Sequence, residues 1–136
     1  MADYKSEFKR YMDQNGIKYS ELSGGQIRVA YNANNIKTVP IIVFFDDNGN
    51  NLVEFICFQI ATFKDDKFGA GLVVCNSLNA KYRWVKFCLD SDSDVLCKMD
   101  AYVDMATVGE ECMNLIRRMV GIIDETYPEF MKALWA

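Results

Sequence analysis

Three acidic side chains repeat at alternate positions in one short segment of this chain, namely Asp90, Asp92 and Asp94. The spacing matches the first three ligand positions of a calcium-binding loop, in which carboxylates supply hard oxygen ligands. The rest of that loop does not follow, because Val95 stands where the loop needs glycine and Ala101 where it needs a bidentate glutamate. We therefore predict a solvated turn, and we expect neither a metal nor another cofactor.

A second set of carboxylates suggests acid–base chemistry. Asp100 and Asp104 would share one face of a strand if that strand continued to residue 104. The chain has no histidine, however, which removes the commonest general base and the usual activator of a serine or cysteine nucleophile. No glycine-rich phosphate loop, nucleophile elbow or metal-ligand spacing accompanies the pair. We predict that the protein is not an enzyme, and a carboxylate-dependent enzyme stays the weaker alternative.

Cysteine usage indicates a reducing compartment. The cysteines are odd in number, contain no C-x-x-C pair and stand in apolar surroundings; they are Cys57, Cys75, Cys88, Cys97 and Cys112. This argues against disulfides and zinc, and favours free thiols that pack as small hydrophobic side chains. The first ten residues carry five charges where a signal peptide would need an apolar core. We expect a cytoplasmic protein.

Composition narrows the possible partners. The chain has 136 residues, 51% of them hydrophobic, which suits a single domain over 1–136. The net charge is -4, and basic residues cluster no further than a pair such as Arg117 and Arg118, so we expect no nucleic-acid partner. The longest apolar run, 39–45, is far shorter than the roughly 20 residues of a membrane span, so we expect no membrane partner.

Hydrophobic periodicity predicts the elements that would position these residues. The first half reads as a helix capped by Asp3 and stopped at Asn15-Gly16, followed by strands over about 26–32, 38–46 and 51–60. The last two strands flank Asn48-Gly49, a favoured sequence for a type I′ hairpin turn.

The second half reads as a helix over about 66–79, a hairpin of strands over 82–89 and 95–102, and a long final helix. Thr107 and Glu110 match a capping box at the start of that helix, and Pro128 predicts its end or a kink near residue 127. The order is α-β-β-β-α-β-β-α. It predicts the α+β class, with a five-stranded antiparallel sheet packed against three helices.

This element order resembles that of the bacterial YbjN family over about residues 5–133. The resemblance also rests on three segments: Val74-Cys-Asn-Ser-Leu-Asn79, Tyr82-Arg-Trp-Val-Lys-Phe-Cys-Leu89 and Ile123-Asp-Glu-Thr-Tyr-Pro-Glu-Phe130. The most specific piece is Asn76 with Leu78-Asn79. The family is similar to the type III secretion chaperone fold, in which small acidic subunits form homodimers and bind extended segments of other proteins. The resemblance implies a regulatory or chaperone-like role in the bacterial cytosol and supplies no catalytic residue.

Two asparagines three residues apart can project from one face of the middle helix. In the structural interpretation Asn79 takes the left-handed conformation that stops the helix, while Asn76 bonds free carbonyls or the neighbouring strand. In the functional interpretation both side-chain amides meet the backbone of a partner. The structural interpretation is the favoured one.

Aromatic residues are the candidate partner-binding groups. Tyr82 and Trp84 share a face of the predicted strand, either open for contact or covered by a helix. Phe130 and Trp135 lie in the C-terminal segment, and the terminal tryptophan either docks within the chain or anchors a symmetric partner. We predict a non-enzymatic protein-binding module, acting as a homodimer, that holds a protein or peptide segment by β-addition. A small-ligand sensor with a pocket between sheet and helices is the main alternative.

Overall fold

The computed structural model describes residues 3–136 and confirms the α+β class. The helices are α1 (Tyr4–Gln14), α2 (Phe68–Lys81), which follows a short 3-10 turn (Asp65–Lys67), and α3 (Val108–Trp135). The strands are β1 (Ser20–Glu21), β2 (Ile27–Asn32), β3 (Thr38–Phe45), β4 (Leu52–Cys57), β5 (Lys86–Leu89) and β6 (Val95–Tyr102). All pairings are antiparallel, and the order across the sheet is β1-β2-β3-β4-β6-β5.

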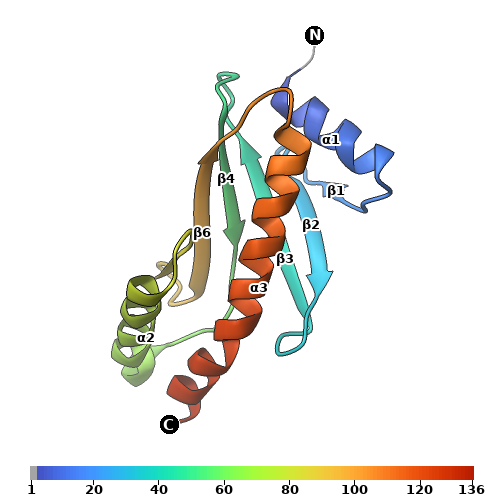
Figure 1. The fold of residues 1–136 in the computed structure, drawn as a ribbon. Coiled ribbons are helices and arrows are strands. Elements are labelled where there is room, and N and C mark those ends of the chain that lie inside the picture. The colour runs from blue at the N-terminus through green and yellow to red at the C-terminus, as the bar shows by residue number, and fades with distance from the viewer. Residues whose placement is uncertain (1–2) are drawn as a thin grey trace.

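The helices pack on one face of the sheet and leave the other face free of helices (Figure 1). Strand β3 shows the consequence, because Val39, Ile41 and Val43 are fully buried while Pro40 and Ile42 between them are only half-buried. Side chains alternate across a strand, so the buried set faces the helices and the other set forms what we call the helix-free face. No helix among residues 3–136 is long and apolar enough to cross a membrane.

Pro40 occupies a central strand without costing a ladder hydrogen bond. Ile42 and Phe44 direct their backbone groups toward β4, and Pro40, two residues before Ile42, has the same orientation. Strand β4, however, pairs with β3 only from Ile42 onward. The missing N–H of Pro40 therefore points to a place where the ladder has already ended, as a proline within a sheet requires.

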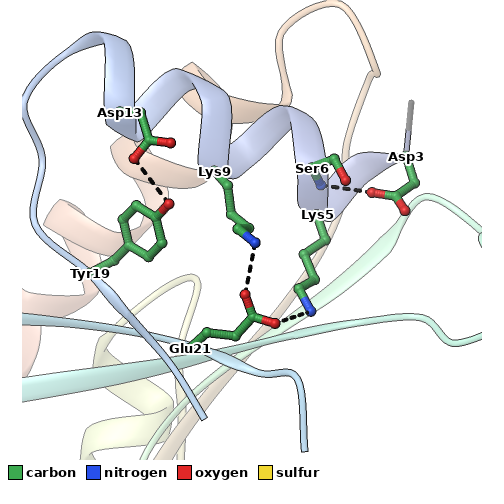
Figure 2. A network of polar contacts seen from close by, with 7 residues as sticks. All are labelled: Asp3, Lys5, Ser6, Lys9, Asp13, Tyr19 and Glu21. Atoms are coloured by element: carbon green, nitrogen blue, oxygen red, sulfur yellow. Dashed lines mark hydrogen bonds and ion pairs between the residues drawn. The ribbon is translucent and has the colours of Figure 1, made fainter. Parts of the chain in front are cut away.

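The sheet has six strands, so the prediction of five was wrong. The additional strand, β1, is two residues long and pairs with Ile27 and Arg28 at the start of β2. So short a strand shows no alternation in the sequence. It is tied to α1 instead, because Glu21 accepts hydrogen bonds from Lys5 (2.9 Å) and Lys9 (2.8 Å), as Figure 2 shows. These bonds, that from Lys9 first, lower the pKa of Glu21 to about 2.

Helix α3 runs through Pro128 to Trp135. Of the two outcomes predicted near residue 127, an end of the helix or a kink, the end is therefore wrong. A proline leaves the carbonyl four residues earlier without its helical partner. Here that carbonyl belongs to Asp124, and it accepts a hydrogen bond from Asn35 Nδ2 at 3.0 Å. Asp124 Oδ1 in turn accepts from the backbone N–H groups of Asn35 (2.7 Å) and Ile36 (3.1 Å). The hairpin between β2 and β3 thus supplies the bond that Pro128 cannot.

Two local predictions were wrong, one about a turn and one about a helix cap. The connection from β3 to β4 spans six residues, 46–51, and among its residues only Gly49 has a positive φ, of 78°, whereas a type I′ turn needs two consecutive residues there. At the start of α3, the Thr107 hydroxyl accepts no bond from the first turn, so the capping box with Glu110 does not form. The hydroxyl donates its hydrogen to Glu111 instead, and Glu111 also accepts from the backbone N–H of Asp104. The predicted cap of the first helix is confirmed, since Asp3 accepts from Ser6 N at 2.7 Å.

Candidate functional site

The two edges of the sheet are built differently, and β5 forms the closed one. Phe87 would present an outward N–H and C=O at this edge, but the side chain of Asn79 in α2 takes both. Its Oδ1 accepts from Phe87 N at 2.7 Å, and its Nδ2 donates to Phe87 O at 2.9 Å. The amide therefore occupies the bonding positions that an added strand would use.

This geometry supports a structural role for Asn79 but corrects the predicted one. Asn79 does not stop the helix, which continues to Lys81 and ends at Tyr82. The bond to the neighbouring strand was assigned to Asn76, which is exposed on the outside of α2. The prediction gave Asn76 the bond that Asn79 makes, because the spacing of the two asparagines alone does not show which one faces β5.

Replacing Asn79 by alanine should lower the free energy of unfolding by about 1 to 2 kcal/mol. Two backbone groups lose their partner, which costs about 1 to 3 kcal/mol, and the better helix propensity of alanine returns about half a kcal/mol. Urea unfolding followed by circular dichroism measures the change. Asn76→Ala, three residues earlier on the same helix, is the control and should leave stability unchanged or slightly raised. Equal effects of the two substitutions would contradict this role for Asn79.

Strand β2 forms the open edge. Strand β1 pairs with it only at Ile27 and Arg28. Ala33, just after β2, donates its N–H to Lys37 across the hairpin. Tyr31 and Val29, two and four residues earlier, therefore also direct their backbone groups to β3. The intervening Ala30 and Asn32 direct their backbone groups away from β3, and both residues are exposed. No described residue bonds to these outward groups. The sequence showed a strand here, but only the pairing pattern shows that half of it lacks an outer neighbour.

The helix-free face beside this edge carries apolar and charged side chains next to one another. One row across the strands contains Ile42 and Ile56 at its centre, with Arg28, Lys98 and Lys86 around them. The next row contains Phe44, Glu54 and Asp100, and Glu54 lies 3.4 Å from Lys98. Further exposed apolar side chains on or beside the sheet are Leu52, Phe58 and Tyr102. Such a surface suits contact with another polypeptide.

Tyr82 and Trp84 do not share the face of a strand, so that prediction was wrong. Tyr82 ends α2, β5 begins only at Lys86, and Trp84 has a φ of 78° in the left-handed region. The structure nevertheless brings both rings to α3. Tyr82 donates its hydroxyl hydrogen to Glu125 at 3.1 Å, and the guanidinium of Arg118 lies 5.5 Å from the Trp84 ring centroid. Trp84 stays 59% exposed.

Of the two C-terminal aromatics, only one is on the surface. Phe130 is fully buried, with its ring centroid 5.4 Å from that of Phe87 and 6.3 Å from that of Phe63. It cannot contact a partner in the folded protein, so its prediction as a partner-binding residue was wrong. Trp135 is 80% exposed at the end of α3. The period of the helix explains the difference, because residues five apart lie on opposite sides.

The two aspartates predicted as an acid–base pair do not lie on one strand face. Strand β6 ends at Tyr102, so Asp104 is not on it and does not share a face with Asp100. Asp90, Asp92 and Asp94 do come together, with carboxylate oxygens within 4.8 Å of one another. Asp90 Oδ1 already accepts from the backbone N–H groups of Asp92 (2.8 Å) and Asp94 (3.0 Å), which is the bonding of a turn-forming aspartate.

The cysteines are free thiols, and most lie in the core. Cys57, Cys75, Cys97 and Cys112 are buried, and Cys88 is half-buried. Burial raises the pKa of Cys57 and of Cys112 to about 12 and that of Cys75 to about 11, and it also raises the pKa of Cys97. Such thiols stay protonated at neutral pH and are poor nucleophiles. Their predicted role as packing residues is confirmed for these four.

Comparison with known proteins agrees with the sequence resemblance. A family model of YbjN, described as "Putative bacterial sensory transduction regulator", matches residues 5–132. The crystal structure of YbjN from E. coli is similar over 89% of this chain and 89% of that chain, with 14% identity and a TM-score of 0.63. The Yersinia pestis type III secretion chaperone SycH, solved with a stable fragment of YscM2, is similar over 88% of this chain and 98% of that chain, with 11% identity and a TM-score of 0.46. No curated protein matches. Since the family model covers almost the whole sequence, this chain belongs to the YbjN family of bacterial proteins.

Proposed function

We propose that this protein is a non-enzymatic binding module of the bacterial cytosol that holds an extended segment of another protein on the open edge of β2. The observation that carries the proposal is the contrast between the two sheet edges. Asn79 closes the β5 edge with two hydrogen bonds, whereas the outward backbone groups of Ala30 and Asn32 have no described partner. An unpaired strand edge is a template for an added strand.

The surroundings of this edge define the kind of segment that fits. An added strand would place alternate side chains over the helix-free face, next to Ala30 and Asn32 of β2, with Pro40 of β3 beyond Ala30. Ala30 and Pro40 are small and apolar, so an apolar side chain beside Ala30 would extend the apolar surface formed with Ile42. The main-chain bonds would supply affinity and the alternate side chains specificity.

The module acts as a homodimer with a regulatory or chaperone-like role. Support comes from large aromatic side chains left on the helix side of the molecule, above all Trp84 (59% exposed) and Trp135 (80% exposed). Tryptophan is enriched among residues that dominate binding energy at protein interfaces. The partner segment and the second subunit thus use different surfaces, so one can bind without displacing the other.

Replacing Ala30 by proline should abolish capture of the partner while leaving the fold intact. The Ala30 N–H points outward, so its loss removes a bond to an added strand but none to β3, and proline is tolerated at such an edge position. Affinity capture from a bacterial lysate with quantitative mass spectrometry compares the two proteins. We expect at least one protein to be retained by the unmodified chain and reduced at least about tenfold by the variant.

Ala30→Ser is the matched control, since it keeps the N–H and adds only a hydroxyl group. The captured protein should then be reduced to a synthetic peptide, and its binding should slow hydrogen exchange of the Ala30 and Asn32 amides. Equal capture by the proline and serine variants, or unchanged exchange at both amides in the complex, would refute β-addition at this edge.

A further inference from the structure

The part of α3 that carries Arg117, Arg118, Gly121 and Glu125 is exposed to solvent, and no other described element lies in front of this helix (Figure 1). At its middle lies Gly121, where an added Cβ would meet nothing within 4 Å. A shallow depression surrounds it, lined by residues of α3 and by Asn35 of the β2–β3 hairpin. The missing side chain allows the backbone of another helix to approach closely at this point.

The charges on this face are antisymmetric about Gly121. Arg117 and Arg118 precede it by four and three residues, and Asp124 and Glu125 follow it by three and four. The same relation holds further out, because Glu110 lies eleven residues before Gly121 and Lys132 eleven residues after it. If a second α3 crossed antiparallel at Gly121, every one of these groups would face the opposite charge.

We infer that the exposed face of α3 is the homodimer interface, in which two α3 helices cross antiparallel at Gly121 about a two-fold axis. The inference rests on the homodimer of the proposed function and names its surface. Residues seven apart lie on the same side of a helix, as Arg118 and Glu125 do on one side of α3 and Arg117 and Asp124 on the other. Arg118 of one copy would therefore face Glu125 of the other, and Arg117 would face Asp124. Both contacts occur twice because a two-fold interface uses the same residues from each subunit.

The aromatic residues of the β5 side belong to the same surface. Trp84 lies over Arg118, and Tyr82 donates a hydrogen bond to Glu125, so both rings flank the crossing on one side of α3. Trp84 would contribute the apolar area that a purely charged contact lacks.

The size of the surface sets the expected strength of the dimer. From Glu110 to Lys132 the helix extends about 33 Å, and a contact about 10 Å wide with Trp84 added buries on the order of 400 to 500 Å² per copy. This is at the small end of specific interfaces. We expect a micromolar dissociation constant that rises with ionic strength, because exposed charge pairs are screened by salt.

Charge reversal at the facing pair tests the interface. Sedimentation at high micromolar concentration and low salt should show a dimer for the unmodified protein. Arg118→Glu and Glu125→Arg should each raise the dissociation constant at least about tenfold, because each places like charges opposite one another. An equimolar mixture of the two variants, and the chain carrying both substitutions, should regain the dimer, because opposite charges then face one another again. Both residues are exposed, so the fold should persist in every variant, as circular dichroism verifies.

Trp84→Ala should also weaken the dimer, whereas Tyr102→Ala, which removes an exposed aromatic from the helix-free face, should not. A dimer indifferent to both charge reversals, or variants whose mixture stays monomeric, would overturn this interface while leaving the proposed homodimer on another surface. A monomeric unmodified protein would refute the interface and the homodimer together. The β2 edge is judged separately, since Ala30→Pro should capture no partner yet dimerise normally.

Discussion

Replacing Phe130 by alanine should lower the free energy of unfolding by about 3 to 5 kcal/mol, which is typical of truncating a fully buried phenylalanine. Phe130 has no exposed surface, and its ring packs against those of Phe63 and Phe87. Phe63 lies in the segment before α2 and Phe87 in β5, so the cavity would loosen the contact of α3 with both. Because domains of this size are stable by only about 5 to 15 kcal/mol, the midpoint of urea unfolding should fall markedly.

Trp135→Ala is the matched control, because it removes a larger aromatic side chain from the same helix. Trp135 is 80% exposed, so its loss should change stability by no more than about 0.5 kcal/mol. Both variants are compared at protein concentrations low enough to keep the chain monomeric. Equal costs of the two substitutions would contradict the burial of Phe130 in the core.

Side-chain periodicity carries enough information to place most elements of this fold. In β2, the burial of Ile27 and Val29 next to the more exposed Arg28 and Ala30 follows directly from the alternation in the sequence. The start of α1 at Asp3 and its end at Asn15-Gly16 were equally readable, because capping is decided by neighbours in sequence. Predictions of this kind succeed where the forces that set the structure are local.

The predictions that failed depend on contacts between distant residues. Pro128 does not end α3 because Asn35, far away in sequence, bonds the carbonyl that the proline leaves free. The strand expected from residue 82 begins only at Lys86, since α2 continues to Lys81 and Asn79 holds Phe87 from the side. A spacing of residues does not reveal such partners.

The candidate surfaces were only partly readable for the same reason. Trp84 was predicted as a candidate contact residue on a strand face that does not exist, and the sequence left open whether a helix covers it. The free half of β2 is a property of pairing, and the sequence of Ala30 and Asn32 has no feature that distinguishes it from a paired strand. The charge pattern about Gly121 is present in the sequence, yet it acquires meaning only once the structure shows which face of α3 is exposed.

Gly109→Ala should destabilise the fold by about 3 kcal/mol or more, although alanine is the better helix former. Gly109 is buried where α3 crosses α1, and an added Cβ would lie 2.2 Å from both Cβ and Cγ of Tyr11. Carbon atoms in contact prefer 3.5 to 4.0 Å. The Tyr11 Cβ is fixed to the backbone, so no change of rotamer relieves the overlap and α1 itself must move away from α3. Chemical denaturation measures the loss.

Gly69→Ala separates this steric effect from helix propensity. Gly69 is also the second residue of its helix, but an added Cβ there would meet nothing within 4 Å. We expect Gly69→Ala to leave stability unchanged or raise it by up to about 1 kcal/mol. A double-mutant cycle completes the test: in a Tyr11→Gly background the overlapping atoms are gone, so Gly109→Ala should cost little. A loss that persists in that background would mean that Gly109 is needed for its backbone and not for the close approach of α1.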